Sequence, residues 1–107
     1  MKRKKRGCIV NIGSKISRNT LVGANKTLYA TTKYAIEGFS FALNRELKLC
    51  GIRVACLMPG TVNTFPSLAA KNYLSPYQVA EMIVLIIRSE SIDFESVVFK
   101  SWRQDNV

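Results

Sequence analysis

Three short apolar runs, separated by longer amphipathic stretches, dominate the hydrophobic pattern of the chain. The runs span residues 8–12, 52–58 and 96–99. Nearly continuous apolar composition over so few residues predicts buried strands of a parallel sheet. The first run leads into Gly13 and Ser14, and the second into Pro59 and Gly60, so a turn follows each of them.

The stretches between these runs carry apolar residues at the spacing of amphipathic helices. Within residues 28–49, the expected core stripe consists of Ile36, Phe39, Leu43 and Leu47. A second helix is expected to run from Ser75, whose side chain can cap its first turn, to about Ser89. Strand, helix, strand, helix, strand is the order of an α/β fold with a parallel sheet and crossover helices.

Charge is concentrated at the start of the chain. The 107 residues carry a net charge of +9, and five of the sixteen basic residues lie in residues 2–6. Such a run is typical of a nucleic-acid or nuclear-import patch, or of the solvated end of a helix. We favour the helix end and expect no nucleic-acid partner, because no aromatic residues interleave with the run and no groove-reading motif follows it.

Other classes of protein find little support. The longest apolar run, residues 82–87, is far shorter than a membrane span, so we expect no membrane partner and a cytoplasmic location. The three cysteines form no C-x-x-C motif and the chain has no histidine, so we expect free thiols and no metal site.

The best candidate for chemistry is the pair Tyr29 and Lys33 near the start of the first helix. Residues four apart share a helical face, and an ammonium beside a phenol stabilises the phenolate, which suits tyrosine to proton transfer. A solvated Tyr–Lys pair is the alternative, since this spacing is common by chance. Ser14 and Thr64 follow strands, at the sheet edge where α/β proteins bind ligands, and this convergence favours a functional site.

Four segments of the sequence, in the order of the family, resemble the short-chain dehydrogenase/reductases. They are residues 9–14, 29–33, 51–54 and 59–64. The resemblance implies a partial Rossmann-like doubly wound parallel sheet of about three strands with two main helices. It also implies an NAD(P)-dependent oxidoreductase that transfers hydride between a nicotinamide, of NAD or NADP, and a small-molecule carbonyl or alcohol substrate.

The resemblance also implies roles for individual residues. Tyr29 matches the catalytic acid/base of the Y-x-x-x-K motif, Lys33 the lysine that assists it and holds the nicotinamide ribose, and Ser14 the serine that hydrogen-bonds the substrate oxygen. The segment that contacts the nicotinamide corresponds to Pro59, Gly60, Val62 and Thr64. Ser17 is an alternative to Ser14, because the Ser14–Tyr29 spacing is longer than usual, but Ser14 follows its strand directly.

The family's glycine-rich turn for the cofactor pyrophosphate has no counterpart among the six glycines of the chain. We therefore expect residues 1–107 to be the C-terminal half of a single domain, a fragment in which residues 1–6 end a helix begun upstream. The fragment alone should be inactive. The resemblance implies homo-oligomers through residues 30–49 of the full-length form, and the alternative is a non-catalytic module that pairs with a full-length relative.

Overall fold

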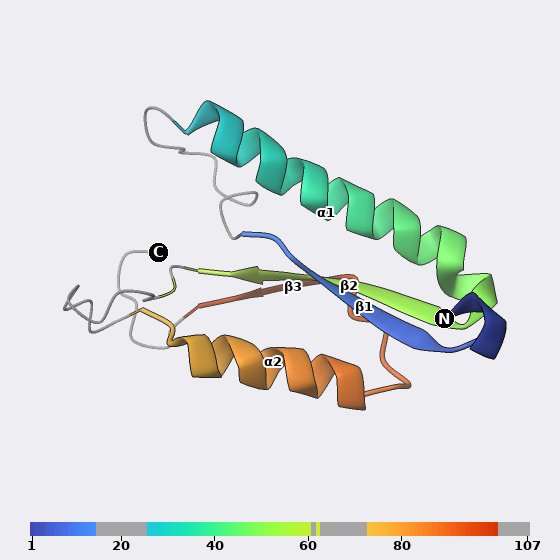
Figure 1. Ribbon diagram of the computed structural model, residues 1–107. Helices are drawn as coiled ribbons and strands as arrows, with labels where there is room; N and C mark the ends of the chain where they lie inside the picture. Colours follow the sequence, from blue (N-terminus) through green and yellow to red (C-terminus); the bar gives the residue numbers. More distant parts are fainter. Residues whose placement is uncertain (15–25, 61, 63–72, 101–107) are drawn as a thin grey trace.

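The computed structural model describes residues 1–14, 26–60, 62 and 73–100, and it has the expected α/β architecture (Figure 1). In chain order, the elements are η1 (Lys2–Lys4), β1 (Gly7–Ile12), α1 (Thr27–Leu47), η3 (Lys48–Cys50), β2 (Ile52–Pro59), α2 (Pro76–Arg88) and β3 (Ser96–Phe99). The predicted three strands and two main helices are thereby confirmed.

The sheet has the order β1-β2-β3, and both strand pairs are parallel. Gly7 lies opposite Ile52, and Cys56 lies opposite Ser96. Helix α1 covers one face of the sheet and α2 the other (Figure 1). Among the described residues β1 pairs with β2 alone, so its outer edge is free.

Strand β2 forms the centre of the core because both of its faces are covered. Ala55 and Leu57 are buried together with Ile86 of α2. The partly buried residues around this cluster are Cys8, Val10, Val79, Met82, Ile83, Phe94, Val97 and Phe99. Since side chains alternate along a strand, Val54 and Cys56, also buried, point to the α1 side.

Arg53, the only charged residue of β2, ties that strand to the end of α2. Its Nη1 donates to the carbonyl oxygens of Ile86, at 2.9 Å, and Ser89, at 3.1 Å, and its Nη2 donates to that of Ile87 at 3.0 Å. The last carbonyl groups of a helix have no partners within the helix. Arg53 therefore satisfies acceptors that would otherwise need water.

The face that α1 turns to the sheet differs from the predicted stripe. Phe39 is 62% exposed, whereas Ser40 and Asn44 are buried. The prediction of Phe39 as a core residue is therefore wrong. The inner face accommodates Ser40 because its Oγ accepts from Asn11 Nδ2 at 2.9 Å and donates to the Ile36 carbonyl at 2.7 Å.

Asn44 completes the hydrogen bonding of β2 where β3 does not reach. β3 pairs with β2 only from Cys56 onward. The Val54 N–H lies before that point and donates instead to Asn44 Oδ1 at 2.9 Å. Asn44 Nδ2 donates to Asp93 Oδ1 at 3.0 Å, and Lys48 Nζ lies 3.4 Å from Asp93 Oδ2. One side chain thus links helix, sheet and the loop before β3.

The predicted start of α2 is confirmed in detail. Ser75 Oγ accepts from the Gln78 N–H at 3.2 Å, and the Gln78 side chain accepts from the Ser75 N–H at 2.8 Å. This reciprocal capping box, with Pro76 in the first turn, fixes where the helix begins. None of the helices that the structure describes is both long and apolar enough to cross a bilayer.

Two residues with left-handed backbone conformation lie at the end of the molecule where β1 and β2 begin. Gly51 ends η3 with a φ of 73°, and Lys5 ends the single turn η1 with a φ of 54°. A Cβ on Gly51 would collide with the Lys5 carbonyl. Glycine is therefore required at position 51 both for the backbone angle and for the close approach of η1.

Candidate active site

The residues singled out from the sequence fall at one end of the molecule. The carboxyl ends of β1 and β2 and the beginning of α1 all lie at that end (Figure 1). Ser14 follows β1, Tyr29 and Lys33 lie in the first two turns of α1, and Gly60 follows β2. Two further predicted residues, Ser17 and Thr64, lie outside the residues that the structure describes.

Tyr29 and Lys33 are in contact, as their spacing predicts. Lys33 Nζ lies 5.7 Å from the centroid of the Tyr29 ring, and Lys26 Nζ lies 5.5 Å from it. Both distances are within the range of a cation–π interaction. Tyr29 is 46% exposed and Lys33 is half-buried. The phenol is thus open to a ligand and carries two cations against its ring.

Gly13 determines how Ser14 reaches this end. The Gly13 N–H donates to the Leu57 carbonyl at 2.7 Å, so pairing with β2 continues one residue past β1. Gly13 is buried, and a Cβ there would lie 3.1 Å from Cys56 Sγ and 3.3 Å from Met58 Cγ. Glycine lets the end of the strand pair closely beside β2, and the half-buried Ser14 therefore lies at the sheet edge.

The end of β2, like the end of β1, is hydrogen-bonded to the neighbouring strand. Pro59 is buried opposite Phe99, and the Gly60 N–H donates to the Phe99 carbonyl at 2.7 Å. Beyond it, the half-buried Val62 forms a parallel bridge with Leu74, which is 4% exposed. Mostly buried apolar side chains therefore adjoin the polar groups at this edge.

One contribution to the site was not predicted. The hydrogen bond from Asn11 to Ser40 connects β1, the strand that leads to Ser14, with α1, the helix that carries Tyr29. It therefore helps to set the separation of the two elements. The sequence shows Asn11 as a polar residue inside an apolar run, but this pattern does not identify the residue to which it hydrogen-bonds.

The site offers groups for hydrogen bonding and proton transfer rather than for metal binding. A hydroxyl follows β1, and a phenol and an ammonium lie in the first two turns of α1. Within the described ranges, no group of three or more His, Cys, Asp or Glu side chains could hold a metal ion.

Comparisons with known proteins agree on one family. The sequence profile described as "short chain dehydrogenase" matches residues 1–72. Dehydrogenase/reductase SDR family member 9 of Bos taurus is 35% identical over 107 residues, which cover 95% of this chain and 30% of that protein. Retinol dehydrogenase 7 of Rattus norvegicus is 44% identical over 62 residues, 58% of this chain and 19% of that protein.

Solved structures share the fold. A 3-oxoacyl-[acyl-carrier protein] reductase with bound NAD from Brucella melitensis superposes with a TM-score of 0.74 at 30% identity, covering 92% of this chain and 40% of that one. The closed form of a serine dehydrogenase complexed with NADP+ gives 0.77 at 23% identity, with 100% and 50% covered. The chain spans less than a third of the length of the two curated relatives.

Proposed function

The chain belongs to the short-chain dehydrogenase/reductase family, and on that premise we propose that it forms the proton-transfer and substrate side of an NAD(P)-dependent oxidoreductase. The observation that carries the proposal is the contact of Lys33 with the half-exposed Tyr29 ring, 5.7 Å from its centroid, at the sheet edge to which Ser14 belongs. All three residues fall within the matched residues 1–72.

The edge suits the nicotinamide end of such a cofactor. Half-buried Val62 provides an apolar contact for a flat ring beside Gly60, with buried Pro59 before them in the chain. The Lys33 ammonium and the Tyr29 hydroxyl provide partners for ribose hydroxyls. From the family resemblance we assign Thr64 to the same group. The sequence contains no glycine-rich turn for a pyrophosphate. The fit therefore extends to the nicotinamide end, for NAD and NADP alike.

The residues of the chain account for the proton in the reaction. When bound, the cofactor supplies or accepts the hydride. In the direction of reduction, Tyr29 donates its phenolic proton to the substrate oxygen, and in oxidation it takes the proton back. Ser14 hydrogen-bonds that oxygen, and the ammonium groups of Lys33 and Lys26 stabilise negative charge that develops there.

For the substrate, we propose a bulky apolar alcohol or carbonyl compound of the retinoid or steroid kind. Two sequence relatives are a retinol dehydrogenase and a 17-beta-hydroxysteroid dehydrogenase, both from Rattus norvegicus. Apolar side chains border the edge here as well. Leu28 beside Tyr29 is 82% exposed, and Tyr73 beside the Val62–Leu74 bridge is 41% exposed. An apolar substrate would cover these side chains.

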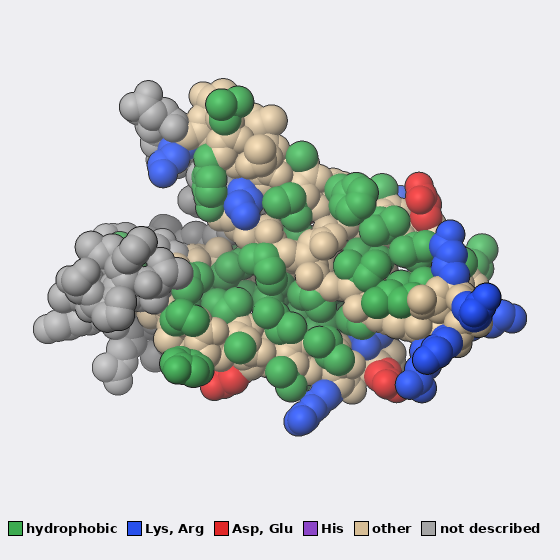
Figure 2. Space-filling view, viewed as in Figure 1, with side chains coloured by type: hydrophobic (Ala, Val, Ile, Leu, Met, Phe, Trp, Pro, Cys, Tyr) green, Lys and Arg blue, Asp and Glu red, His purple; other side chains and the backbone are tan. Residues whose placement is uncertain are grey.

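We also propose that residues 1–107 are the C-terminal half of one Rossmann domain, with residues 1–6 belonging to its preceding helical segment. Figure 2 shows apolar side chains gathered between α1 and α2, over the free edge of β1. Solved relatives contain about twice the length of this chain. Further strands of the sheet would pair along this edge, and without them the chain should bind NAD(P) weakly.

A second candidate is a non-catalytic module that pairs with a full-length relative. It is favoured by the outer face of α1, where Phe39 is 62% exposed and Tyr34 is 48% exposed. The same face would serve homo-oligomers formed through residues 30–49. In the pairing hypothesis, substitutions of Phe39 abolish association and substitutions of Tyr29 change nothing.

The experiment compares Tyr29→Phe with Tyr34→Phe in residues 1–107 fused behind an amino-terminal half that carries a glycine-rich turn. Both changes remove one hydroxyl from α1, and the two residues are almost equally exposed, at 46% and 48%. Tyr29→Phe should lower turnover of retinol about 10²–10⁴-fold and leave NAD(P) binding intact. Tyr34→Phe should preserve both. Turnover that survives in Tyr29→Phe would overturn the proposal.

A further inference from the structure

We propose that the end of the molecule opposite the candidate active site docks on membranes that contain anionic lipid. This surface, the basic end, comprises Met1, Lys2, Arg3, Lys4, Lys5, Arg6, Lys48, Leu49 and Ile92. The proposal does not depend on the proposed enzymatic function. It is carried by the charge, the exposed apolar side chains and the geometry of this end.

The charge of the basic end is largely unneutralised. Residues 2–6 are all exposed, and none of them has an ion-pair partner among residues 1–14, 26–60, 62 and 73–100. Figure 2 shows the Lys and Arg side chains gathered at this end. Asp93 is already held by Lys48 and Asn44, so Glu46 in the last turn of α1 and Glu90 after α2 offset part of the charge. Clusters of four to eight cations are typical of surfaces that bind anionic lipid.

Apolar side chains project from the same end. Leu49 is 98% exposed, Met1 60% and Ile92 49%. An almost fully exposed leucine next to Lys48 gains nothing in water, but it can enter the boundary between headgroups and acyl chains. Cations that attract the surface and apolar groups that enter it are the two components of peripheral membrane binding.

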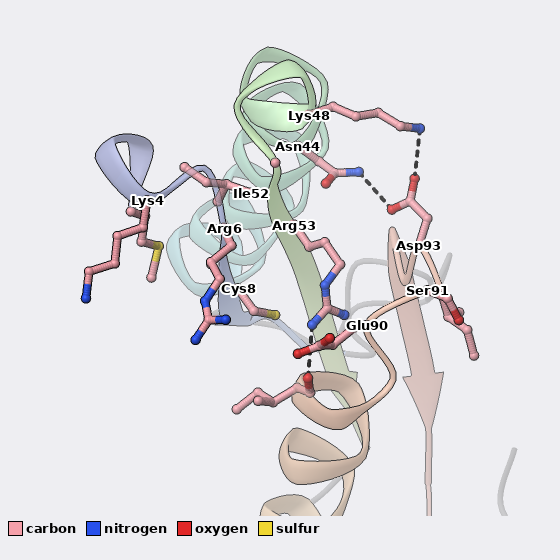
Figure 3. Close-up of a pocket in the computed structure, with 15 residues that line it drawn as sticks. Lys4, Arg6, Cys8, Asn44, Lys48, Ile52, Arg53, Glu90, Ser91 and Asp93 are labelled. Carbon is pink, nitrogen blue, oxygen red and sulfur yellow. Dashed lines mark hydrogen bonds and ion pairs between the residues drawn. The ribbon is translucent and has the colours of Figure 1, made fainter.

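The basic end is a built surface rather than a loose tail. A cavity of about 840 Å³ is lined by Lys4, Arg6 and Lys48 and by the acidic Glu90 and Asp93 (Figure 3). Met1 and Ile92 also line it. The η1 turn is fixed because the left-handed Lys5 lies against Gly51, where a side chain would collide with its carbonyl. The backbone that carries the basic residues 2–6 is therefore held beside Gly51.

These features favour lipid over nucleic acid as the partner. The three-residue η1 is too short to enter a groove, and no aromatic ring lies among residues 1–6 to stack on a base. Exposed Leu49 would gain nothing from a phosphate backbone. The proposal departs from the expectation of no membrane partner, which rested on the absence of a long apolar run. Surface docking requires no such run.

Docking through the basic end would leave the candidate active site in water. The strands begin near the basic end and finish at the sheet edge of the candidate active site, and β2 has eight residues. At about 3.3 Å per residue it spans about 26 Å, more than the headgroup depth that a docked surface enters. Tyr29 would then face away from the bilayer.

The test measures co-sedimentation of residues 1–107 with vesicles of phosphatidylcholine alone and with about 30% phosphatidylserine. Binding should require phosphatidylserine and should be lost when salt rises from about 0.05 M to 0.5 M. K2Q/K4Q should weaken partitioning about thirtyfold, from about 1 kcal/mol per cation. L49S should weaken it about tenfold.

Matched variants at the opposite end test the location of the surface. K26Q/K100Q removes the same charge, and L28S removes a leucine that is 82% exposed. Each should change partitioning less than about threefold, because these residues lie more than a Debye length from the lipid. Equal effects at both ends, binding to phosphatidylcholine alone, or no binding would overturn the proposal. Tighter retention by a 20-base-pair DNA duplex than by the vesicles would identify nucleic acid as the partner instead.

Discussion

Replacing Asn44 with alanine should lower the free energy of unfolding by about 2–4 kcal/mol, because this buried side chain accepts a hydrogen bond from the buried Val54 N–H that water cannot replace equally. Asn44 is 4% exposed, and the Val54 N–H that it accepts belongs to a residue only 2% exposed. No other strand in the described part of the chain reaches this N–H, since the β2–β3 pairing begins at Cys56.

The magnitude is the sum of a large and a small contribution. Leaving the Val54 N–H unsatisfied costs about 1–3 kcal/mol, and the truncated side chain adds about 1 kcal/mol of lost packing. The bond to Asp93 contributes little, because the Asp93 side chain is 41% exposed and water or Lys48 can replace Asn44. The loss should therefore follow the backbone contact.

Urea denaturation followed by far-ultraviolet circular dichroism measures the loss. With a slope of about 1–3 kcal/mol per molar urea, the midpoint should fall by about 1–3 M. Asn44→Asp keeps an acceptor for Val54, but it buries a carboxylate against Asp93 and should therefore remain less stable than the parent. Adding Asp93→Asn should restore the donor–acceptor pair and most of the stability. An alanine variant within about 0.5 kcal/mol of the parent would refute the reasoning.

The remaining predictions concern the backbone and the helix ends. Gly51→Ala should destabilise the protein by about 2–4 kcal/mol, since the φ of Gly51 is 73° and an added Cβ would meet a carbonyl group. Gly38→Ala, with open space around it, should stabilise the protein by about 0.5–1 kcal/mol. Thermal unfolding distinguishes the two variants. Arg53→Met should expose the end of α2 to faster amide hydrogen exchange and cost about 1–3 kcal/mol. Ser75→Ala should cost about 1 kcal/mol in urea and fray the first turn of α2.

The order and type of the elements could be predicted because local signals and tertiary packing agree there. The capping box at Ser75 and the apolar run at residues 96–99 are self-contained, so α2 and β3 begin where the sequence predicts. The spacing of Tyr29 and Lys33 likewise placed both side chains together, because helical geometry alone determines it.

The inner face of α1 could not be predicted by the same means. Apolar residues occur around much of this helix, so periodicity does not identify the face that meets the sheet. The helix contacts the sheet through Ser40 and Asn44, whose partners Asn11 and Val54 are distant in sequence. Their burial depends on hydrogen bonds that exist only after the sheet forms, and a reading of hydrophobicity alone assigns such residues to the surface.

The unpaired side of β1 also makes this chain a natural element for a split-protein reporter. A seam along a strand edge is closed mainly by main-chain hydrogen bonds, so a complementary polypeptide produced separately could add to it in trans. The six residues of β1 would determine the register of pairing, and the apolar side chains between α1 and α2 would stabilise the association. The proposed turnover, restored by such pairing, would then report the association of two fused partners inside a cell, and peptides that bind the edge could act as competitors.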